Sequence, residues 1–220
     1  MAPKQIKVVG IDLAGSAKRP TGVCCLREDE VVDSRVVYED DEILGFVKKN
    51  RPKIVAMDAP LSLPPGRKLT ANGGFPPDNK VHLRSCDEEL RRRGIRFFPV
   101  TLGPMRSLTI RGIALKERLE ASGYRAIEIY PGGAQDVWGI ARKQQGLSLL
   151  RGGLRRKLGV KGLSAKMSDH ELDAVSGAIV GRLFLEGRAE VYGDFERGAI
   201  VMPAMNQRVS RRVSGQPIKP

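Results

Sequence analysis

The chain has 220 residues, of which 41% are hydrophobic and 29% are charged, a composition typical of a globular domain rather than of a disordered chain. It contains no run of about 18 apolar residues and no apolar N-terminal segment, so we expect neither a membrane span nor a signal peptide. Its three cysteines lack the spacing of a disulfide framework or a zinc site, which predicts a reduced, cytoplasmic protein.

The net charge of +13 favours a polyanionic partner such as nucleic acid, although a generally basic surface would give the same number. The distribution of charge supports the first interpretation, because residues 137–168 contain no acid and many bases. Such a one-signed segment is typical of a surface that follows phosphates. The candidate nucleic-acid-binding residues are Arg91, Arg106, Arg111, Arg142, Lys143, Arg151, Arg155, Arg156 and Lys157.

The first predicted element is a buried strand within residues 6–16, a β-branched apolar run that ends in a Gly-Ser turn. Asp12 interrupts this run. A charge within a sheet is costly unless it is paired or holds a cation, so Asp12 is a candidate site residue. The simpler alternative is an Asp that caps the following turn.

Two further β-rich runs, 21–26 and 31–38, follow with a short polar link and predict an antiparallel meander. Residues 40–50 predict a helix, with acids in its first turn and lysines in its last. The next strand, 53–60, again ends in an Asp, Asp58. A right-handed helical crossover makes this strand parallel to an earlier one.

If this strand lies beside the first, Asp12 and Asp58 emerge at the same edge of the sheet. Two carboxylates in that position repel each other unless a cation lies between them. The Pro/Gly-rich segment 61–81 begins directly after Asp58, so we assign it to the substrate side.

A helix over 85–93, an irregular segment over 97–105 and a longer helix that ends at Gly123 come next. The fifth strand, 124–131, carries Glu128. We expect one domain over residues 1–205, with a helical and loop insertion over about 61–123. A basic tail, 206–220, is expected to be flexible.

Ser168 and Glu171 form a capping-box pattern at the start of a helix that reaches Glu186. Asp169 and Asp173 lie four residues apart on one face of this helix. Asp169 is explained as a first-turn acid, but Asp173 lies deeper among apolar residues and is a candidate site residue. A final β segment is expected between residues 188 and 203.

Only two histidines are present, which argues against a mechanism centred on histidine. His170 could shuttle a proton, but a plain surface histidine is the simpler interpretation.

Four motifs carry a resemblance to a known family: GIDLAG at 10–15, AMDAPL at 56–61, IEIYP at 127–131 and HELDA at 170–174. In this order they resemble domain-of-unknown-function family 429, a group of predicted nucleases with a ribonuclease H-like fold. The resemblance implies an α/β fold with helices on both sides of a mixed sheet, in the order 3-2-1-4-5 with strand 2 antiparallel.

The same resemblance implies a nuclease that hydrolyses phosphodiester bonds with two Mg²⁺ or Mn²⁺ ions held by carboxylates. Carried onto this chain, Asp12 would bridge the two ions. Asp173, with Asp58 or Glu128 at neighbouring strand ends, would complete the shells.

Two other functions remain open. The segment 10–16 also resembles the phosphate loop of the actin, Hsp70 and sugar-kinase superfamily, which would make the protein an ATP-binding phosphotransferase. Those proteins need two lobes and a second glycine-rich loop, and no convincing second loop is found. The third possibility is a non-catalytic nucleic-acid-binding module that uses the basic segment 142–166.

Overall fold

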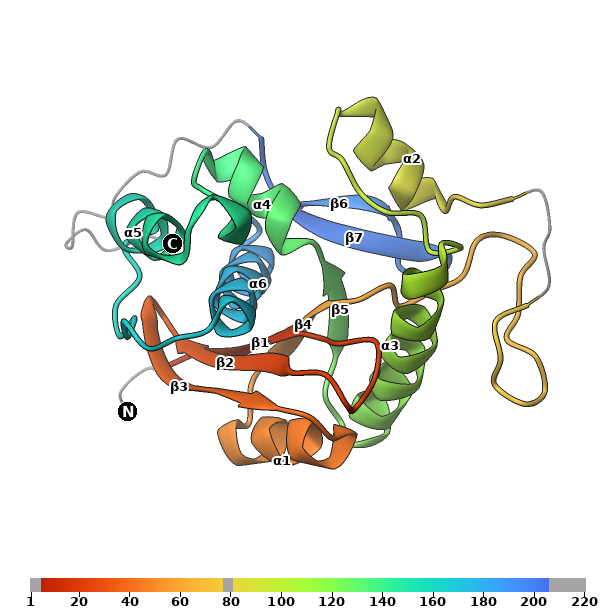
Figure 1. Ribbon diagram of the computed structural model, residues 1–220, viewed down its shortest axis with the longest axis horizontal. Coiled ribbons are helices and arrows are strands. Elements are labelled where there is room, and N and C mark those ends of the chain that lie inside the picture. Colours follow the sequence, from red (N-terminus) through yellow and green to blue (C-terminus); the bar gives the residue numbers. More distant parts are fainter. Residues whose placement is uncertain (1–4, 77–80, 206–220) are drawn as a thin grey trace, which may run out of the picture.

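The computed structural model describes residues 5–76 and 81–205, which include a single seven-stranded sheet in the order β3-β2-β1-β4-β5-β7-β6 (Figure 1). The strands are β1 (Lys7–Asp12), β2 (Thr21–Arg27), β3 (Glu30–Val37), β4 (Ile54–Asp58), β5 (Ala126–Ile129), β6 (Ala189–Asp194) and β7 (Gly198–Pro203). The helices are α1 (Asp40–Asn50), α2 (Ser85–Arg92), α3 (Gly103–Ala121), α4 (Pro131–Trp138), α5 (Leu147–Leu158) and α6 (Asp169–Leu185), with a 3₁₀ turn η1 (Lys143–Gln145).

The predicted strand order 3-2-1-4-5 is confirmed, and the chain extends it with β7 and β6. Strand β2 is antiparallel to both β1 and β3, whereas β1, β4 and β5 run parallel. The final β segment predicted from sequence forms two antiparallel strands, of which β7 is parallel to β5. The predicted tail 206–220 lies outside the described residues.

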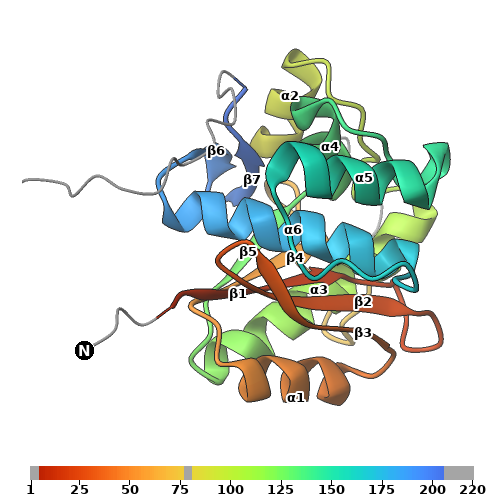
Figure 2. The ribbon, with the colours of Figure 1, turned by 90° about the vertical axis from the view of Figure 1, so that its left-hand side faces the viewer.

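Helices cover both faces of the sheet (Figure 2). Helix α6 lies directly on one face, with α4 and α5 beside it, and shares an apolar core with the sheet residues Val8, Ala56 and Ile127. Helices α1 and α3 cover the other face, where Met57 and Ala126 are buried. Helix α2 packs on β6 and β7. Among the described residues, no helix is both long and apolar enough to cross a bilayer.

Helix α3 begins at Gly103, two residues before the end of the segment predicted to be irregular. Pro104 stands in its first turn, where a helix tolerates proline because the missing N–H has no intrahelical partner. Helices α2 and α3 both lie in the connection between β4 and β5.

Two glycines allow α6 to lie unusually close to β1 and β2. A Cβ atom on Gly10 would lie 1.9 Å from the carbonyl oxygen of Ala174, and one on Gly22 would lie 2.1 Å from that of His170. Any larger residue would therefore meet the backbone of α6. This close approach brings the first turns of α6 over the end of β1.

The first turn of α6 is fixed by the predicted capping box. The Glu171 backbone donates to the Ser168 hydroxyl, and the Glu171 carboxylate accepts from the Ser168 backbone N–H. The hydroxyl of Ser34 on β3 donates to the other oxygen of Glu171 at 2.9 Å. The turn that carries Asp169 and His170 is thereby anchored to the sheet.

Candidate metal centre

Asp12 and Asp58 are the last residues of β1 and β4 and face each other in register across the parallel pair. Their side chains point towards α6, because Gly10 and Ala56, two residues earlier in each strand, lie against that helix. Asp12 is buried, with 8% of its surface exposed, and Asp58 is half-buried. The predicted convergence of these carboxylates at one edge of the sheet therefore follows from the register.

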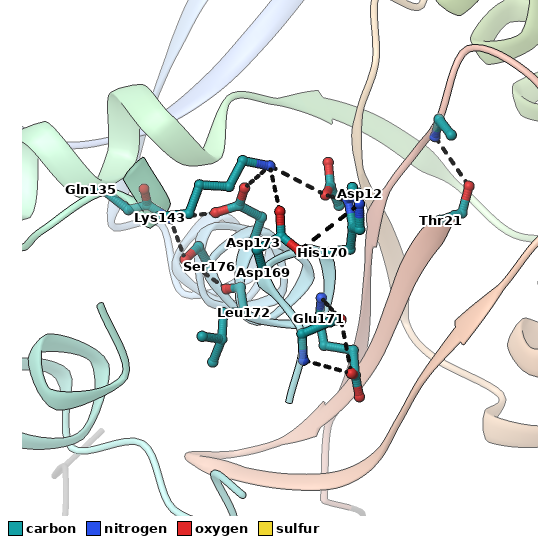
Figure 3. Close-up of polar contacts among 12 residues, drawn as sticks. Asp12, Thr21, Gln135, Lys143, Asp169, His170, Glu171, Leu172, Asp173 and Ser176 are labelled. Atoms are coloured by element: carbon teal, nitrogen blue, oxygen red, sulfur yellow. Dashed lines mark hydrogen bonds and ion pairs between the residues drawn. The ribbon is translucent and has the colours of Figure 1, made fainter. Parts of the chain in front are cut away.

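Helix α6 brings Asp173 and His170 to the same edge (Figure 3). The Nδ1 atom of His170 lies 2.8 Å from Oδ2 of Asp12. This hydrogen bond raises the pKa of His170, against the effect of partial burial. The histidine contacts Asp12 directly and so belongs to the cluster, which differs from the simpler expectation of a plain surface residue.

Asp173 is held by Gln135, a residue that the sequence did not single out. Gln135 lies on α4 with 1% exposure and donates from Nε2 to Oδ1 of Asp173 at 2.7 Å. The same nitrogen lies 3.1 Å from the hydroxyl of Ser176, which in turn donates to the Leu172 carbonyl. Because Gln135 and Ser176, the two donors in this series of hydrogen bonds, are buried, one oxygen of Asp173 has a fixed direction.

Lys143 projects its ammonium group into the midst of the carboxylates (Figure 3). Its Nζ atom lies 2.9 Å from Oδ2 of Asp173, 3.7 Å from Oδ2 of Asp169 and 3.9 Å from Oδ2 of Asp12. Burial lowers the pKa of Lys143, but Asp12 and Asp173 outweigh it and raise the pKa overall. The sequence placed Lys143 on a nucleic-acid surface, whereas its ammonium lies at the candidate site. Asp169 is a first-turn acid of α6 as predicted, and it also lies beside this ammonium.

The carboxylates repel each other in this setting. Loss of solvation, and then repulsion by Asp12 and Asp173, raises the pKa of Asp58 well above its usual range. Burial likewise raises the pKa of Asp173, although Lys143 opposes it. An additional cation would relieve this repulsion.

The donor set fits a hard divalent cation, which prefers carboxylate oxygens. The ammonium of Lys143 shows that the carboxylates can surround a positive charge. Within residues 5–76 and 81–205, however, no three Asp, Glu, His or Cys side chains already converge as a metal cluster. Binding an ion would therefore need side-chain rotation around the ammonium.

Glu128 does not join the other three predicted carboxylates. Its β-register partner is Met57, not Asp58, so its side chain leaves the sheet on the face opposite to α6. There, Arg84 donates to both carboxylate oxygens at 2.7 and 2.8 Å, and the Leu61 backbone N–H donates at 2.8 Å. We therefore remove Glu128 from the predicted metal ligands.

Arg84 joins Glu128 to α2. The guanidinium is 2% exposed and also donates to both oxygens of Asp87, in the first turn of that helix. Burial raises the pKa of Glu128, although Arg84 opposes it. These contacts fix the chain three residues after Asp58, because the Leu61 N–H is one of the donors.

Several predicted nucleic-acid-binding arginines are bound within the protein. Arg111 is buried and donates to the carbonyls of Ala14 and Tyr38 and to Asp40. Its guanidinium therefore anchors the loop after β1 and is not available to bind a phosphate. Arg106 donates to the Thr101 carbonyl at 2.8 Å.

The bases from η1 to α5 differ in exposure. Arg142 is paired with Asp136 on α4, and Arg151 and Arg155 donate to carbonyls of the segment 163–165. The predicted bases that are exposed are Arg91, Arg155, Arg156 and Lys157, of which Arg155 and Lys157 also donate to backbone carbonyls.

The structure is similar to that of the RuvC protein of Thermus thermophilus in complex with a Holliday junction substrate, with a TM-score of 0.50 and 13% sequence identity. The match covers 83% of this chain and 96% of that one. A second Thermus thermophilus RuvC structure matches with a TM-score of 0.45 and 14% identity, over 83% of this chain and 97% of that one.

No curated protein matches the sequence. The strand order, together with the first of these likenesses, shows the ribonuclease H-like fold. The sequence model of one family, described as a protein of unknown function, DUF429, matches residues 10–197. This chain belongs to that family.

Proposed function

We propose that this protein is a metal-dependent nuclease that hydrolyses phosphodiester bonds of nucleic acid. The observation that carries the proposal is the placement of Asp12 and Asp58 in register at one edge of the sheet, with Asp173 of α6 joined to Asp12 through the ammonium of Lys143. Acids that share a site and repel each other without a cation are a common feature of such centres.

In this proposal Asp12, Asp58 and Asp173 hold Mg²⁺ or Mn²⁺. A bound divalent ion lowers the pKa of water and stabilises negative charge on a phosphate. His170 keeps an oxygen of Asp12 in place, and Gln135 does the same for Asp173. Such outer hydrogen bonds fix the direction of a ligand before it binds.

The two ions implied by the family resemblance would add four positive charges beside Lys143. Asp12, Asp58, Asp169 and Asp173 supply at most four negative charges near that lysine, reached only when all four carboxylates are ionised. The number of metal ions therefore depends on whether Lys143 remains in the site.

Nucleic acid is the proposed substrate class because of the net charge of +13 and the exposed bases Arg156 and Lys157 on α5. Helix α5 lies on the same side of the sheet as α6, which carries Asp173 (Figure 2). The similar RuvC structure is a complex with a Holliday junction, so branched DNA is the first substrate to test.

The phosphotransferase alternative gains no support, because it needs two lobes and the described part of the chain has one sheet. The binding-module alternative is separated from the nuclease by a mutation. The binding module predicts that nucleic acid still binds after the carboxylates of the site are removed, and that the unmutated protein does not cleave nucleic acid.

The test is cleavage of labelled branched and linear DNA and RNA with Mg²⁺ or with a chelator. Asp12→Asn should abolish metal-dependent cleavage and leave the fold intact, as measured by circular dichroism. The matched control is Asp41→Asn, an exposed acid on α1 at the opposite face of the sheet. Equal cleavage by Asp12→Asn and the unmutated protein would disprove the proposal.

A further inference from the structure

Lys143 occupies an unusual place for a lysine in a basic segment. Its side chain is 28% exposed, and its Nζ atom contacts Asp173 directly, with Asp12 and Asp169 within 4 Å. These three acids come from β1 and from the first turns of α6. The ammonium therefore bridges the two elements that form the candidate centre.

The backbone beside Lys143 holds it in this place. Arg142 donates from Nε to Asp136 at 2.8 Å, pairs with the second oxygen of that carboxylate and lies over the ring of Tyr130. The side chain of Gln145 accepts the Arg142 backbone N–H at 2.8 Å. The 3₁₀ turn that begins with Lys143 is thus tied to α4 through Arg142 and closed internally by Gln145.

The charges of the site explain why a fixed lysine matters. A hydrolytic centre with two metal ions uses two cations, one near the attacking water and one near the leaving oxygen. The carboxylates here already have one cation that belongs to the chain. A second metal ion would have to displace Lys143, and it would face the repulsion of a charge only a few ångströms away.

We propose that Lys143 is the second cation of the centre, so that a single divalent ion completes it. This inference rests on the proposed nuclease function. In the reaction the oxygen of water forms a bond to phosphorus, the bond from phosphorus to the leaving oxygen breaks, and a proton from water ends on the leaving oxygen. Lys143 donates hydrogen bonds to the negatively charged phosphate oxygens and keeps its own proton.

The test adds Mn²⁺ to metal-free protein of full length. The EPR signal of the Mn²⁺ that stays free in solution gives the number of bound ions by difference. The unmutated protein should bind one ion per chain at this site. Lys143→Met, which removes the charge and shortens the side chain by one atom, should bind two. Lys143→Arg, which keeps the charge, should bind one.

Cleavage provides the second readout. Lys143→Met should cleave at least about a hundredfold more slowly at Mn²⁺ concentrations that fill one site, a loss typical of a removed electrostatic group. Lys143→Arg should recover part of the rate. Lys48→Met, an exposed lysine on α1, is the matched control and should change neither the ion count nor the rate.

The outcomes separate this inference from the proposed function. Two ions on the unmutated protein would overturn the role of Lys143 and leave the nuclease proposal standing. No bound ion would remove the nuclease proposal itself. One ion and an unchanged rate in Lys143→Met would reduce Lys143 to a surface cation. If Lys143→Met did not fold, the number of ions bound by the unmutated protein and by Lys143→Arg would still test the inference, because each should bind one ion and two ions on either would contradict it.

Discussion

The close contact between α6 and β1 makes Gly10→Ala a sharp test of how the site is built. The added Cβ atom would lie 1.9 Å from the carbonyl oxygen of Ala174 and 2.6 Å from the backbone N of Ala178. Ordinary contact begins at 3.4 Å, so the helix would have to move by about 1.5 Å. No side chain can rotate to relieve this clash, because both atoms belong to the backbone of α6.

Overpacking a core costs about 1–3 kcal/mol, and a backbone clash belongs at the upper end of that range. The reduced entropy of the unfolded chain offsets about 0.4–1 kcal/mol of this cost. We therefore expect Gly10→Ala to lower the free energy of unfolding by about 2 kcal/mol. Because α6 carries Asp173 and His170, the same displacement should weaken Mn²⁺ binding.

Gly45→Ala is the matched control. Gly45 is exposed in the middle of α1, and a Cβ atom there would meet nothing within 4 Å. Alanine should therefore stabilise the protein by about 0.5–1 kcal/mol through its higher helix propensity. Urea denaturation followed by circular dichroism measures both variants. If Gly10→Ala were as stable as Gly45→Ala, α6 would not lie on β1 as described.

Three further predictions address the surroundings of the site. Arg84→Met leaves two buried carboxylates unpaired and should lower the free energy of unfolding by about 3–5 kcal/mol in urea denaturation; a loss below 1 kcal/mol would contradict a buried ion pair. Gln135→Leu removes the donor that orients a ligand carboxylate and should weaken Mn²⁺ binding by about 10–100-fold in a titration, while an unchanged affinity would exclude that role. Replacing Arg156 and Lys157 by Gln should weaken DNA binding and reduce its salt slope by about 0.9 for each lost phosphate contact, measured by fluorescence anisotropy. Lys48→Gln on the opposite face should leave that slope unchanged, and an equal effect of both changes would argue against α5 as the binding surface.

The parts of the site that the sequence predicted depend on local pattern. Asp12 and Asp58 each close an apolar strand, and a parallel pair of such strands brings their ends together. Asp173 was found because helical spacing places it beyond the first turn, where capping no longer explains an acid. These features need only secondary structure, which the hydrophobic pattern predicts, and strand order, which the family resemblance implies.

The parts that were missed depend on register and on distant contacts. Glu128 is the next-to-last residue of β5, and its pairing with Met57 sends its side chain to the other face, which no local pattern reveals. Lys143 and Arg111 look like surface bases in the sequence. Their partners lie far away along the chain, since Arg111 donates to the Ala14 carbonyl and Lys143 pairs with Asp173 at 2.9 Å.

The most direct test of the metal centre is the anomalous-difference map of crystals grown with Mn²⁺. We expect a peak whose nearest protein atoms are carboxylate oxygens of Asp12 and Asp173, with Asp58 beside it and Glu128 still paired with Arg84. A map with no peak at these carboxylates, or with the ion bound by Glu128, would contradict the account.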